Sequence, residues 1–443
     1  MAASKKNGSP IPVYRISRLP NGLRVATAEM PHMTSVSLGI WAGAGSRYEP
    51  APLNGASHFI EHMLFKGTRR RSPLEISQAV EGIGGYLNAF TSEESTCFYS
   101  KARHECFEDL LDVLTDMYLH SRFAPEDIRK EREVIKEEVA QYFDEPQQYV
   151  LELLNALQWP GQPLGRPITG TFETLDAMGR RHLTTFLREH YRAGNTLICA
   201  AGRITHAQAL RAVRALAGKF ASGTPPAFAP AAGRPQGPVV HLHWRKTEQT
   251  QFALGLRTCS RHDPARWALR LLSVVLGENM SSRLFQKLRE DSGMAYSIQS
   301  SVSFFADTGD LVIAGGLDAE KLGPALELIW RELEDLATHA LRPAELRRAR
   351  DYLLGQIDLS LENTESQMMN LGEQCLGLND FLPPVEVKAA LSRVTAAEMR
   401  AVAARYFRPE RCSLAVISSD KSVGRIALRE LPGNPQLVQS LSA

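Results

Sequence analysis

Apolar residues recur along this chain with two different spacings, and these spacings predict its helices and strands. Residues 107–120, for example, repeat apolar positions at helical spacing. Short apolar segments also occur in adjacent pairs, at 85–91 with 94–101 and at 295–305 with 308–315. Adjacent strands of this kind form antiparallel hairpins. The pattern therefore predicts the α+β class, with a mixed, largely antiparallel sheet and helices packed on one side.

The same succession of elements occurs twice, which indicates a tandem repeat. An apolar strand at 34–41 has a counterpart at 250–256, and the segment 123–128 has one at 341–346. Further matches fall at the same offset of about 215 to 218 residues. Repetition at one nearly fixed spacing predicts two tandem homologous domains.

A segment rich in proline and glycine, residues 222–238, separates the two repeats. Proline and glycine at this density cannot sustain a helix or a central strand, so we expect an interdomain linker. The expected organisation is a flexible tail at 1–12, a first domain at 13–221, this linker, and a homologous second domain at 239–443.

Composition agrees with a soluble globular protein of two domains. The chain has 443 residues, of which 44% are hydrophobic and 23% charged. A formal net charge of +2 gives no sign of a nucleic-acid partner. No apolar run approaches the roughly 18 residues of a membrane-spanning helix. The six cysteines lack a CxxC pair and are expected to be reduced core thiols. The N-terminus has two lysines but no apolar segment, so no secretory signal is expected there.

The most informative chemical feature is the sequence HFIEH at residues 58–62. On an α-helix, His58 and His62 lie one turn apart on the same face, where two neutral imidazoles can bind one Zn²⁺. Glu61 precedes the second histidine, close enough to take a proton from a metal-bound water. The pattern HxxEH is the inverzincin signature and predicts a metallopeptidase. The alternative interpretation is an ordinary polar helix face.

A catalytic zinc needs a third protein ligand, and an acidic helical run can supply it. This helix is expected to begin near Pro125, because proline and the acidic residues after it suit a first turn. Glu131 and Glu138 are two turns apart and share one face, whereas Glu137 lies about 100° from Glu138 and is expected in solvent. Without the histidines, this run would be interpreted as a charged surface helix.

Four segments together resemble the pitrilysin and insulysin family of inverzincin metallopeptidases. Within that family they are most similar to the processing-peptidase branch, that is, to the beta subunit of mitochondrial processing peptidase and its single-chain bacterial homologues. The segments are 58–68, 84–91, 131–138 and 284–297. Their joint occurrence in this order is more specific than any one of them, and the resemblance extends from about Leu23 to about Ser418.

The resemblance implies a role for several residues of the first domain. Glu138 is the third zinc ligand, and Glu131 is a second acidic residue near the site with a supporting role. Asn88, Ala89 and Phe90 belong to a strand edge that pairs with the backbone of the substrate.

The resemblance also implies that Arg289 and Tyr296 reach from the second domain to the site in the first. Tyrosine can donate a hydrogen bond to the oxyanion that forms at a peptide carbonyl, and arginine can hold substrate carbonyls or a carboxylate. By residue type alone they would be a surface arginine and a half-buried structural tyrosine. The second domain has no HxxEH motif, so one Zn²⁺ per chain is expected.

These observations lead us to expect a zinc-dependent endopeptidase. It would hydrolyse peptides or unfolded polypeptide segments, bound in extended form inside a clamshell chamber. The resemblance implies a dimer, either a homodimer or a heterodimer with a zinc-less homologue. The expected location is the bacterial cytoplasm, with the mitochondrial matrix as the alternative.

Two rival functions belong to other classes. One is a non-catalytic structural or substrate-binding subunit of the same fold, against which the intact set of His58, Glu61, His62 and Glu138 argues. The other is an amidohydrolase that uses the same zinc on small molecules.

Overall fold

The computed structural model describes residues 12–224, 226–233 and 237–438. Residues 1–11 of the expected tail, and residues 225 and 234–236 of the expected linker, lie outside the described residues. The chain divides into two compact units, each made of three segments. Unit 1 comprises the described residues of Met1–Val134, Glu173–Ala227 and Asp358–Pro383, and unit 2 those of Ile135–Phe172, Phe228–Ile357 and Pro384–Ala443. The domain ranges expected from the repeat, 13–221 and 239–443, describe homology and stay a prediction.

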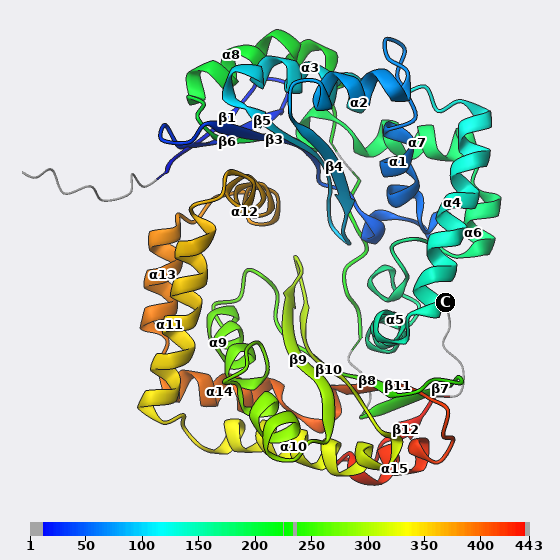
Figure 1. The fold of residues 1–443 in the computed structure, drawn as a ribbon, viewed down its shortest axis with the longest axis vertical. Coiled ribbons are helices and arrows are strands. Elements are labelled where there is room, and N and C mark those ends of the chain that lie inside the picture. Colours follow the sequence, from blue (N-terminus) through cyan, green and yellow to red (C-terminus); the bar gives the residue numbers. More distant parts are fainter. Residues whose placement is uncertain (1–11, 225, 234–236, 439–443) are drawn as a thin grey trace, which may run out of the picture. The chain divides into compact units, whose positions relative to one another are not determined.

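The sheet of unit 1 has six strands in the order β1-β2-β6-β3-β5-β4 (Figure 1). Only β2 and β6 pair in parallel, and the other neighbours pair antiparallel. The strands are β1 (Val13–Arg18), β2 (Arg24–Glu29), β3 (Ser35–Ala42), β4 (Tyr86–Thr91), β5 (Thr96–Arg103) and β6 (Thr196–Gly202).

The sheet of unit 2 also has six strands, in the order β12-β7-β11-β8-β10-β9. Its strands are β7 (Val239–Trp244), β8 (Thr250–Arg257), β9 (Ala295–Phe304), β10 (Gly309–Leu317), β11 (Cys412–Ser418) and β12 (Gln436–Leu437). The run β7-β11-β8-β10-β9 corresponds strand by strand to β2-β6-β3-β5-β4, including the single parallel pair within each run. The prediction of two tandem α+β domains with mixed, largely antiparallel sheets is therefore confirmed.

Helices occupy most of the connections between strands. Those of the first half are α1 (Ala56–Leu64), α2 (Pro73–Glu81), α3 (Phe107–His120), α4 (Pro125–Asp144), α5 (Pro146–Gln158), α6 (Phe172–Ala177), α7 (Arg180–His190) and α8 (His206–Leu216). Those of the second half are α9 (Arg266–Leu276), α10 (Leu322–Thr338), α11 (Pro343–Ser360), α12 (Thr364–Gly377), α13 (Pro384–Arg393), α14 (Ala396–Tyr406) and α15 (Val423–Glu430). A π-helical segment, η7 (Phe285–Asp291), precedes β9, and short 3₁₀ turns such as η1 (Ser46–Tyr48) complete the connections.

Helices cover both faces of the sheet in unit 1, whereas helices on one side only were expected. Phe98 of β5 faces α3, where its ring centroid lies 6.2 Å from that of Tyr118. Neighbouring residues of a strand point to opposite faces, and Cys97 accordingly packs in a cluster with Trp41, Met368 and other residues of α12. The face opposite α3 is therefore buried by α12, a helix from the second half of the chain.

Unit 2 shows the reciprocal arrangement. Its sheet buries one face against α5, a helix from the first half of the chain, through a cluster of Leu154 and its neighbours with Ala253 and Ile417 (Figure 1). The helices α5 and α12 begin at Pro146 and Thr364, which differ by the same 218 residues as the starts of α4 and α11. The two halves of the chain thus exchange equivalent helices. The helix α12 from the second half completes the core of unit 1, and α5 from the first half completes the core of unit 2.

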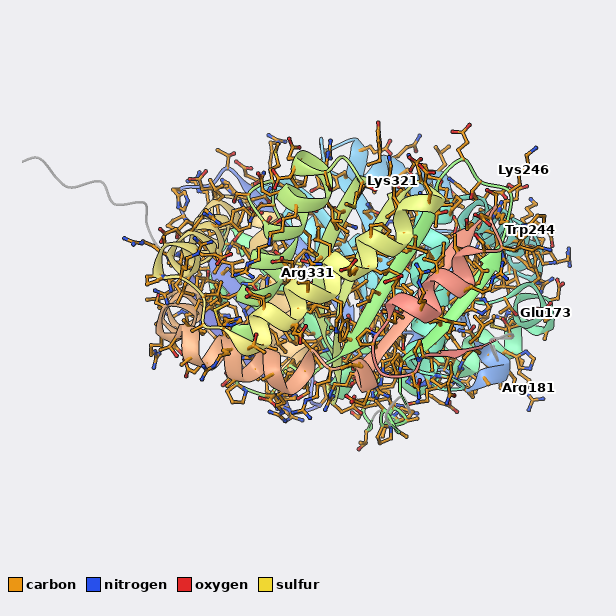
Figure 2. The ribbon with its side chains drawn as sticks, turned by 90° about the horizontal axis from the view of Figure 1, so that it is seen from below. Glu173, Arg181, Trp244, Lys246, Lys321 and Arg331 are labelled. Atoms are coloured by element: carbon orange, nitrogen blue, oxygen red, sulfur yellow. The ribbon has the colours of Figure 1, made fainter. Side chains whose placement is uncertain are left out.

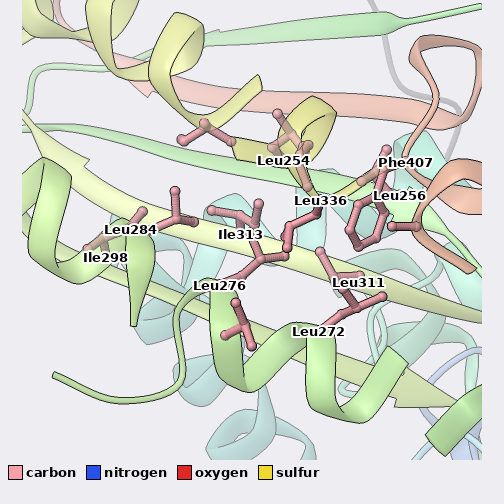
Figure 3. Packing of buried hydrophobic residues seen from close by; sticks show 14 of the residues in the cluster. Leu254, Leu256, Leu272, Leu276, Leu284, Ile298, Leu311, Ile313, Leu336 and Phe407 are labelled. Carbon is pink, nitrogen blue, oxygen red and sulfur yellow. The ribbon is translucent and has the colours of Figure 1, made fainter. Parts of the chain in front are cut away.

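The main core of unit 2 lies on the other face of its sheet. Leu254 and Ile313 of neighbouring strands pack against Leu272 and Leu276 of α9 and against Leu336 of α10 (Figure 3). All five side chains are almost fully buried, and each contributes about 1.5–3 kcal/mol relative to an exposed position. Charged residues such as Lys321 and Arg331 on or next to α10 instead point outward from the ribbon (Figure 2).

All six cysteines are buried and form no disulfide, as expected for core thiols. Among the described helices, none combines the length and the apolar character that a bilayer span requires.

The close packing of α12 on the sheet of unit 1 predicts that one added methyl group at Gly372 destabilises the protein. Gly372→Ala should lower the free energy of unfolding by about 1–3 kcal/mol, because a Cβ at this position would overlap the buried indole of Trp41. Gly355→Ala in α11 is the matched control, since a Cβ there meets no atom within 4 Å. The control should be neutral, or stabilising by up to about 1 kcal/mol. Denaturant midpoints of the two variants check this, and equal midpoints would contradict the observed packing.

Candidate metal centre

The motif HFIEH folds into α1, and the helix is fixed at its N-terminus by a buried carboxylate. Glu49 accepts hydrogen bonds from the backbone N–H groups of Gly55 and Ser57, both at 2.7 Å. A negative charge suits this end of a helix, and Gly55 at φ 92° allows the sharp entry into the helix. Burial raises the pKa of Glu49 to about 7, although the hydrogen bonds from Ser57 and Gly55 act in the opposite direction. The first turn of α1 is therefore fixed directly next to His58.

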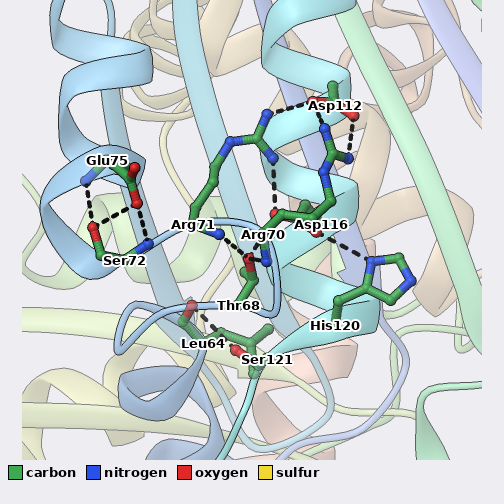
Figure 4. Close-up of polar contacts among 10 residues, drawn as sticks. All are labelled: Leu64, Thr68, Arg70, Arg71, Ser72, Glu75, Asp112, Asp116, His120 and Ser121. Carbon is green, nitrogen blue, oxygen red and sulfur yellow. Dashed lines mark hydrogen bonds and ion pairs between the residues drawn. The ribbon is translucent and has the colours of Figure 1, made fainter.

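The C-terminal end of α1 is fastened to α3 (Figure 4). Ser121 donates from its Oγ to the carbonyl oxygen of Leu64 at 3.3 Å. Farther along, the fully buried carboxylate of Asp116 accepts hydrogen bonds from Thr68 Oγ1 at 2.7 Å and from Arg71 Nη1 at 2.8 Å. These contacts anchor the segment that follows α1, and this segment contains Lys66.

Helical spacing brings the two imidazoles together. His58 Nε2 lies 3.3 Å from His62 Nε2, and the ring centroids are 4.5 Å apart. Two nitrogens bound to one tetrahedral zinc at about 2.0–2.1 Å are expected at about 3.3 Å from one another. The two histidines therefore fit a shared metal ion.

The protonation of His58 also suits a metal ligand, because only a neutral imidazole can bind a metal. Burial and, to a smaller extent, the neighbouring His62 lower the pKa of His58 to about 3, although Glu131 acts in the opposite direction. His58 is thus neutral throughout the physiological range.

The structure places Glu138 beside the two histidines. One ligand atom from each of His58, His62 and Glu138 lies within 4.8 Å of the others. In the part of the chain that the structure describes, no other group of three or more His, Cys, Asp or Glu side chains meets this criterion. Along α4 the neighbouring Glu137 is exposed, as the helical spacing predicts. The described residues thus contain one candidate site, formed by the three side chains expected to be ligands.

Glu131 lies behind His62. Its Oε1 is 2.9 Å from His62 Nδ1, and its Oε2 is 2.7 Å from the ammonium of Lys66. Burial raises the pKa of Glu131, but the hydrogen bonds from His62 and Lys66 outweigh burial and hold that pKa below its usual value. A carboxylate that accepts the Nδ1 proton of a histidine leaves Nε2 as the donor atom for a metal and fixes the ring orientation.

Glu61 also lies on α1, one residue before His62, and its carboxylate is bound from β4. Thr91 donates from Oγ1 to Glu61 Oε2 at 2.6 Å. The side chain is partly exposed, as a group that meets a substrate must be. Neither this hydrogen bond nor the contact of Lys66 with Glu131 was predicted from the sequence.

The residues expected to bind substrate lie on β4, at the edge of the sheet of unit 1. Among the described strands, β4 pairs only with β5, so its other edge carries no strand. Asn88 accepts a hydrogen bond from the N–H of Ala89 at 2.8 Å, and Phe90 packs on Trp41 with ring centroids 5.4 Å apart. An unpaired edge of this kind can take up an extended peptide.

Arg289 and Tyr296 belong to unit 2. Arg289 lies in η7, where its guanidinium stands 5.0 Å from the ring centroid of Phe285. Tyr296 lies on β9, the edge strand of its sheet, and is 74% exposed. Their roles toward a substrate stay predictions.

Comparisons with known proteins identify the family of this chain. The family description "Insulinase (Peptidase family M16)" matches residues 24–172, and "Peptidase M16 inactive domain" matches residues 177–353. An uncharacterized zinc protease of Streptomyces coelicolor is 38% identical over 424 residues, which cover 94% of this chain and 92% of that protein. The chain belongs to peptidase family M16. The resemblance drawn from its motifs is thereby confirmed at the level of the family.

Other relatives of this M16 chain give the same result. The uncharacterized zinc protease YmxG of Bacillus subtilis is 36% identical over 399 residues, covering 90% of this chain and 96% of that protein. Among solved structures, a protease from Helicobacter pylori superposes with a TM-score of 0.87 at 19% identity, covering 92% of this chain and all of that one. This structural likeness supports the fold alone.

The geometry of the centre predicts how strongly each acidic residue contributes to zinc binding. Glu138→Ala should abolish stoichiometric binding, because it removes one of three ligands. Glu131→Ala should weaken binding by about 10- to 100-fold, as loss of a carboxylate behind a ligating histidine does. Glu137→Ala, one position from the ligand on the same helix, should leave the affinity unchanged. Competition with a chelating dye measures all three, and an unchanged affinity in Glu138→Ala would refute the proposed ligand set.

Proposed function

We propose that this chain is a zinc-dependent endopeptidase. The observation that carries the proposal is the group formed by His58, His62 and Glu138, with the carboxylate of Glu61 on the same helix as the histidines. Relatives with 36–38% identity bear the name zinc protease. Three protein ligands with a fourth position left to water is the arrangement of catalytic rather than structural zinc.

The residues of the chain divide the chemistry among them. His58, His62 and Glu138 would hold Zn²⁺, which when bound polarises a carbonyl group and promotes the ionisation of water. Glu61 accepts a proton from the attacking water and passes it to the leaving amine. Glu131 and Lys66 keep the ring of His62 in the orientation that directs Nε2 toward the metal.

We propose further that the substrate binds in extended form along the free edge of β4. Backbone hydrogen bonds along a strand edge read main chain more than side chains, which suits peptides and unfolded segments. As the resemblance to the processing-peptidase branch implies, the two domains would enclose the substrate in a chamber. Tyr296 would then donate a hydrogen bond to the oxyanion, and Arg289 would bind substrate carbonyls or a carboxylate.

The same resemblance supports a dimer. Because this chain has both the zinc motif and the Arg289 and Tyr296 pair, we propose a homodimer rather than a heterodimer with a zinc-less homologue. The mass of the purified chain in solution should be twice that of one chain. A monomer would refute this part of the proposal without affecting the zinc chemistry.

The role of Glu61 is tested by changing its charge alone. Glu61→Gln should retain stoichiometric zinc but lose at least about 100-fold in kcat, since an amide cannot accept the proton. Glu81→Gln, an exposed residue at the end of α2, is the control and should behave like the wild type. The measurement is cleavage of quenched fluorescent peptides together with metal analysis of each preparation.

The choice of substrates separates the proposal from its rivals. Peptides of increasing length should be cleaved, whereas small amides should not. Turnover of small amides alone would indicate an amidohydrolase. A zinc-loaded wild type that cleaves neither would indicate a non-catalytic subunit of the same fold.

A further inference from the structure

The hydrogen bond from Thr91 to Glu61 joins two elements that the proposed function assigns to different tasks. Thr91 is the last residue of β4, the strand whose edge is expected to bind the substrate. Glu61 lies on α1, the helix that carries the two histidines. The distance of 2.6 Å from Thr91 Oγ1 to Glu61 Oε2 indicates a short, well-formed hydrogen bond to a carboxylate.

Such a bond restricts the rotamers that a long side chain can adopt. Glutamate has three side-chain torsions, and ordering it costs up to about 2 kcal/mol in lost rotamer freedom. A donor held at Oε2 limits where that oxygen can lie, and with it the range of directions in which Oε1 can point. The position of Thr91 therefore contributes to the orientation of the Glu61 carboxylate.

One short segment places both partners. The N–H groups of Ser46 and Arg47 donate to the carbonyl oxygens of Ser92 and Glu93, at 3.2 and 2.8 Å, in the turn that directly follows Thr91. The buried Arg47 also forms an ion pair with the partly exposed Glu94 in the same turn, at 2.6 Å.

The end of this segment reaches the other partner. Two residues after Arg47, Glu49 accepts the N–H groups that begin α1, the helix of Glu61. The end of β4 and the start of α1 are thus anchored within five consecutive residues, 45–49. In addition, a Cβ on Gly45 would overlap the backbone of Ser92, so the turn lies directly against this segment.

We propose that Thr91 is a positioning residue that holds the Glu61 carboxylate at a fixed place relative to the substrate-binding edge of β4. This inference rests on the proposed peptidase function, because Thr91 performs no chemical step itself and acts only through Glu61. A peptide bound to the edge of β4 is then presented to a base whose orientation the same strand sets. Small displacements of a reacting group can cost about 100-fold in rate, so this bond affects turnover more than affinity.

The test removes the hydroxyl and then restores it. Thr91→Val, which keeps the shape of the side chain, should lower kcat by about 10- to 100-fold and leave KM for a peptide substrate and zinc content unchanged. Thr91→Ser keeps a hydroxyl and should recover most of the lost kcat. Thr34→Val, an exposed threonine just before β3, is the matched control and should have no effect.

Two further measurements distinguish positioning from general damage. In the Glu61→Gln background, Thr91→Val should cause no additional loss of the residual rate, because the group it orients is already absent. Independently of turnover, a peptide hydroxamate, whose hydroxyl can donate to the Glu61 carboxylate, should bind Thr91→Val at least about 5-fold more weakly than the wild type. That difference should vanish in the Glu61→Gln background.

Each outcome decides the matter. If the wild type cleaves peptides and Thr91→Val matches it in kcat and hydroxamate affinity, the inference about Thr91 is wrong and the proposed function stands. Equal losses of rate in both backgrounds, or no recovery by Thr91→Ser, would show a purely structural role and also overturn it. A zinc-loaded wild type that cleaves no peptide overturns the proposed function and this inference together.

Discussion

Two imidazole nitrogens held 3.3 Å apart form the contact on which the rest of the site depends. Because Glu131 accepts the Nδ1 proton of His62, Nε2 of that ring directs its lone pair toward His58. Burial lowers the pKa of His58 and thereby keeps its imidazole neutral. A divalent cation between the rings would satisfy both nitrogens, and the negative charge of Glu138 would offset the charge of the ion. The arrangement persists because Glu49 and Ser121 fix the two ends of α1.

The exchange of α5 and α12 imposes a second constraint, on the fold as a whole. Each sheet has an apolar face that a helix must cover, and in each unit the covering helix comes from the other half of the chain. A half chain would leave Trp41 and its neighbours, or Ala253 and its neighbours, exposed to water. The two halves are therefore expected to depend on one another for stability, although each carries a complete sheet.

The parts of this structure that were predictable from sequence are those set by local periodicity. Helical geometry alone requires that His58 and His62 share a face, and the class and the tandem repeat follow from similar spacings. Glu138 needed the family resemblance as well, because a charged helix has several acidic candidates. Contacts between residues far apart in sequence, such as Thr91 with Glu61 or Lys66 with Glu131, leave no local sequence pattern from which they could be predicted. The exchange of α5 and α12 could not be predicted for the same reason, because the sequence of an amphipathic helix does not indicate which sheet the helix covers.

The second unit shows what the same fold requires when a helix has no ligands to present. The helix α9 follows β8 as α1 follows β3, but it contains no histidine or glutamate. Its leucines, among them Leu269 and Leu272, are buried in the core of unit 2, whereas α1 leaves His58, Glu61 and His62 only partly buried. To present two imidazoles and a carboxylate, a helix must keep one of its faces outside the core. Less apolar surface is then buried, and the helix loses that contribution to stability. Unit 1 compensates with the polar contacts of Glu49, Asp116 and Glu131, which hold α1 and the segment after it in place.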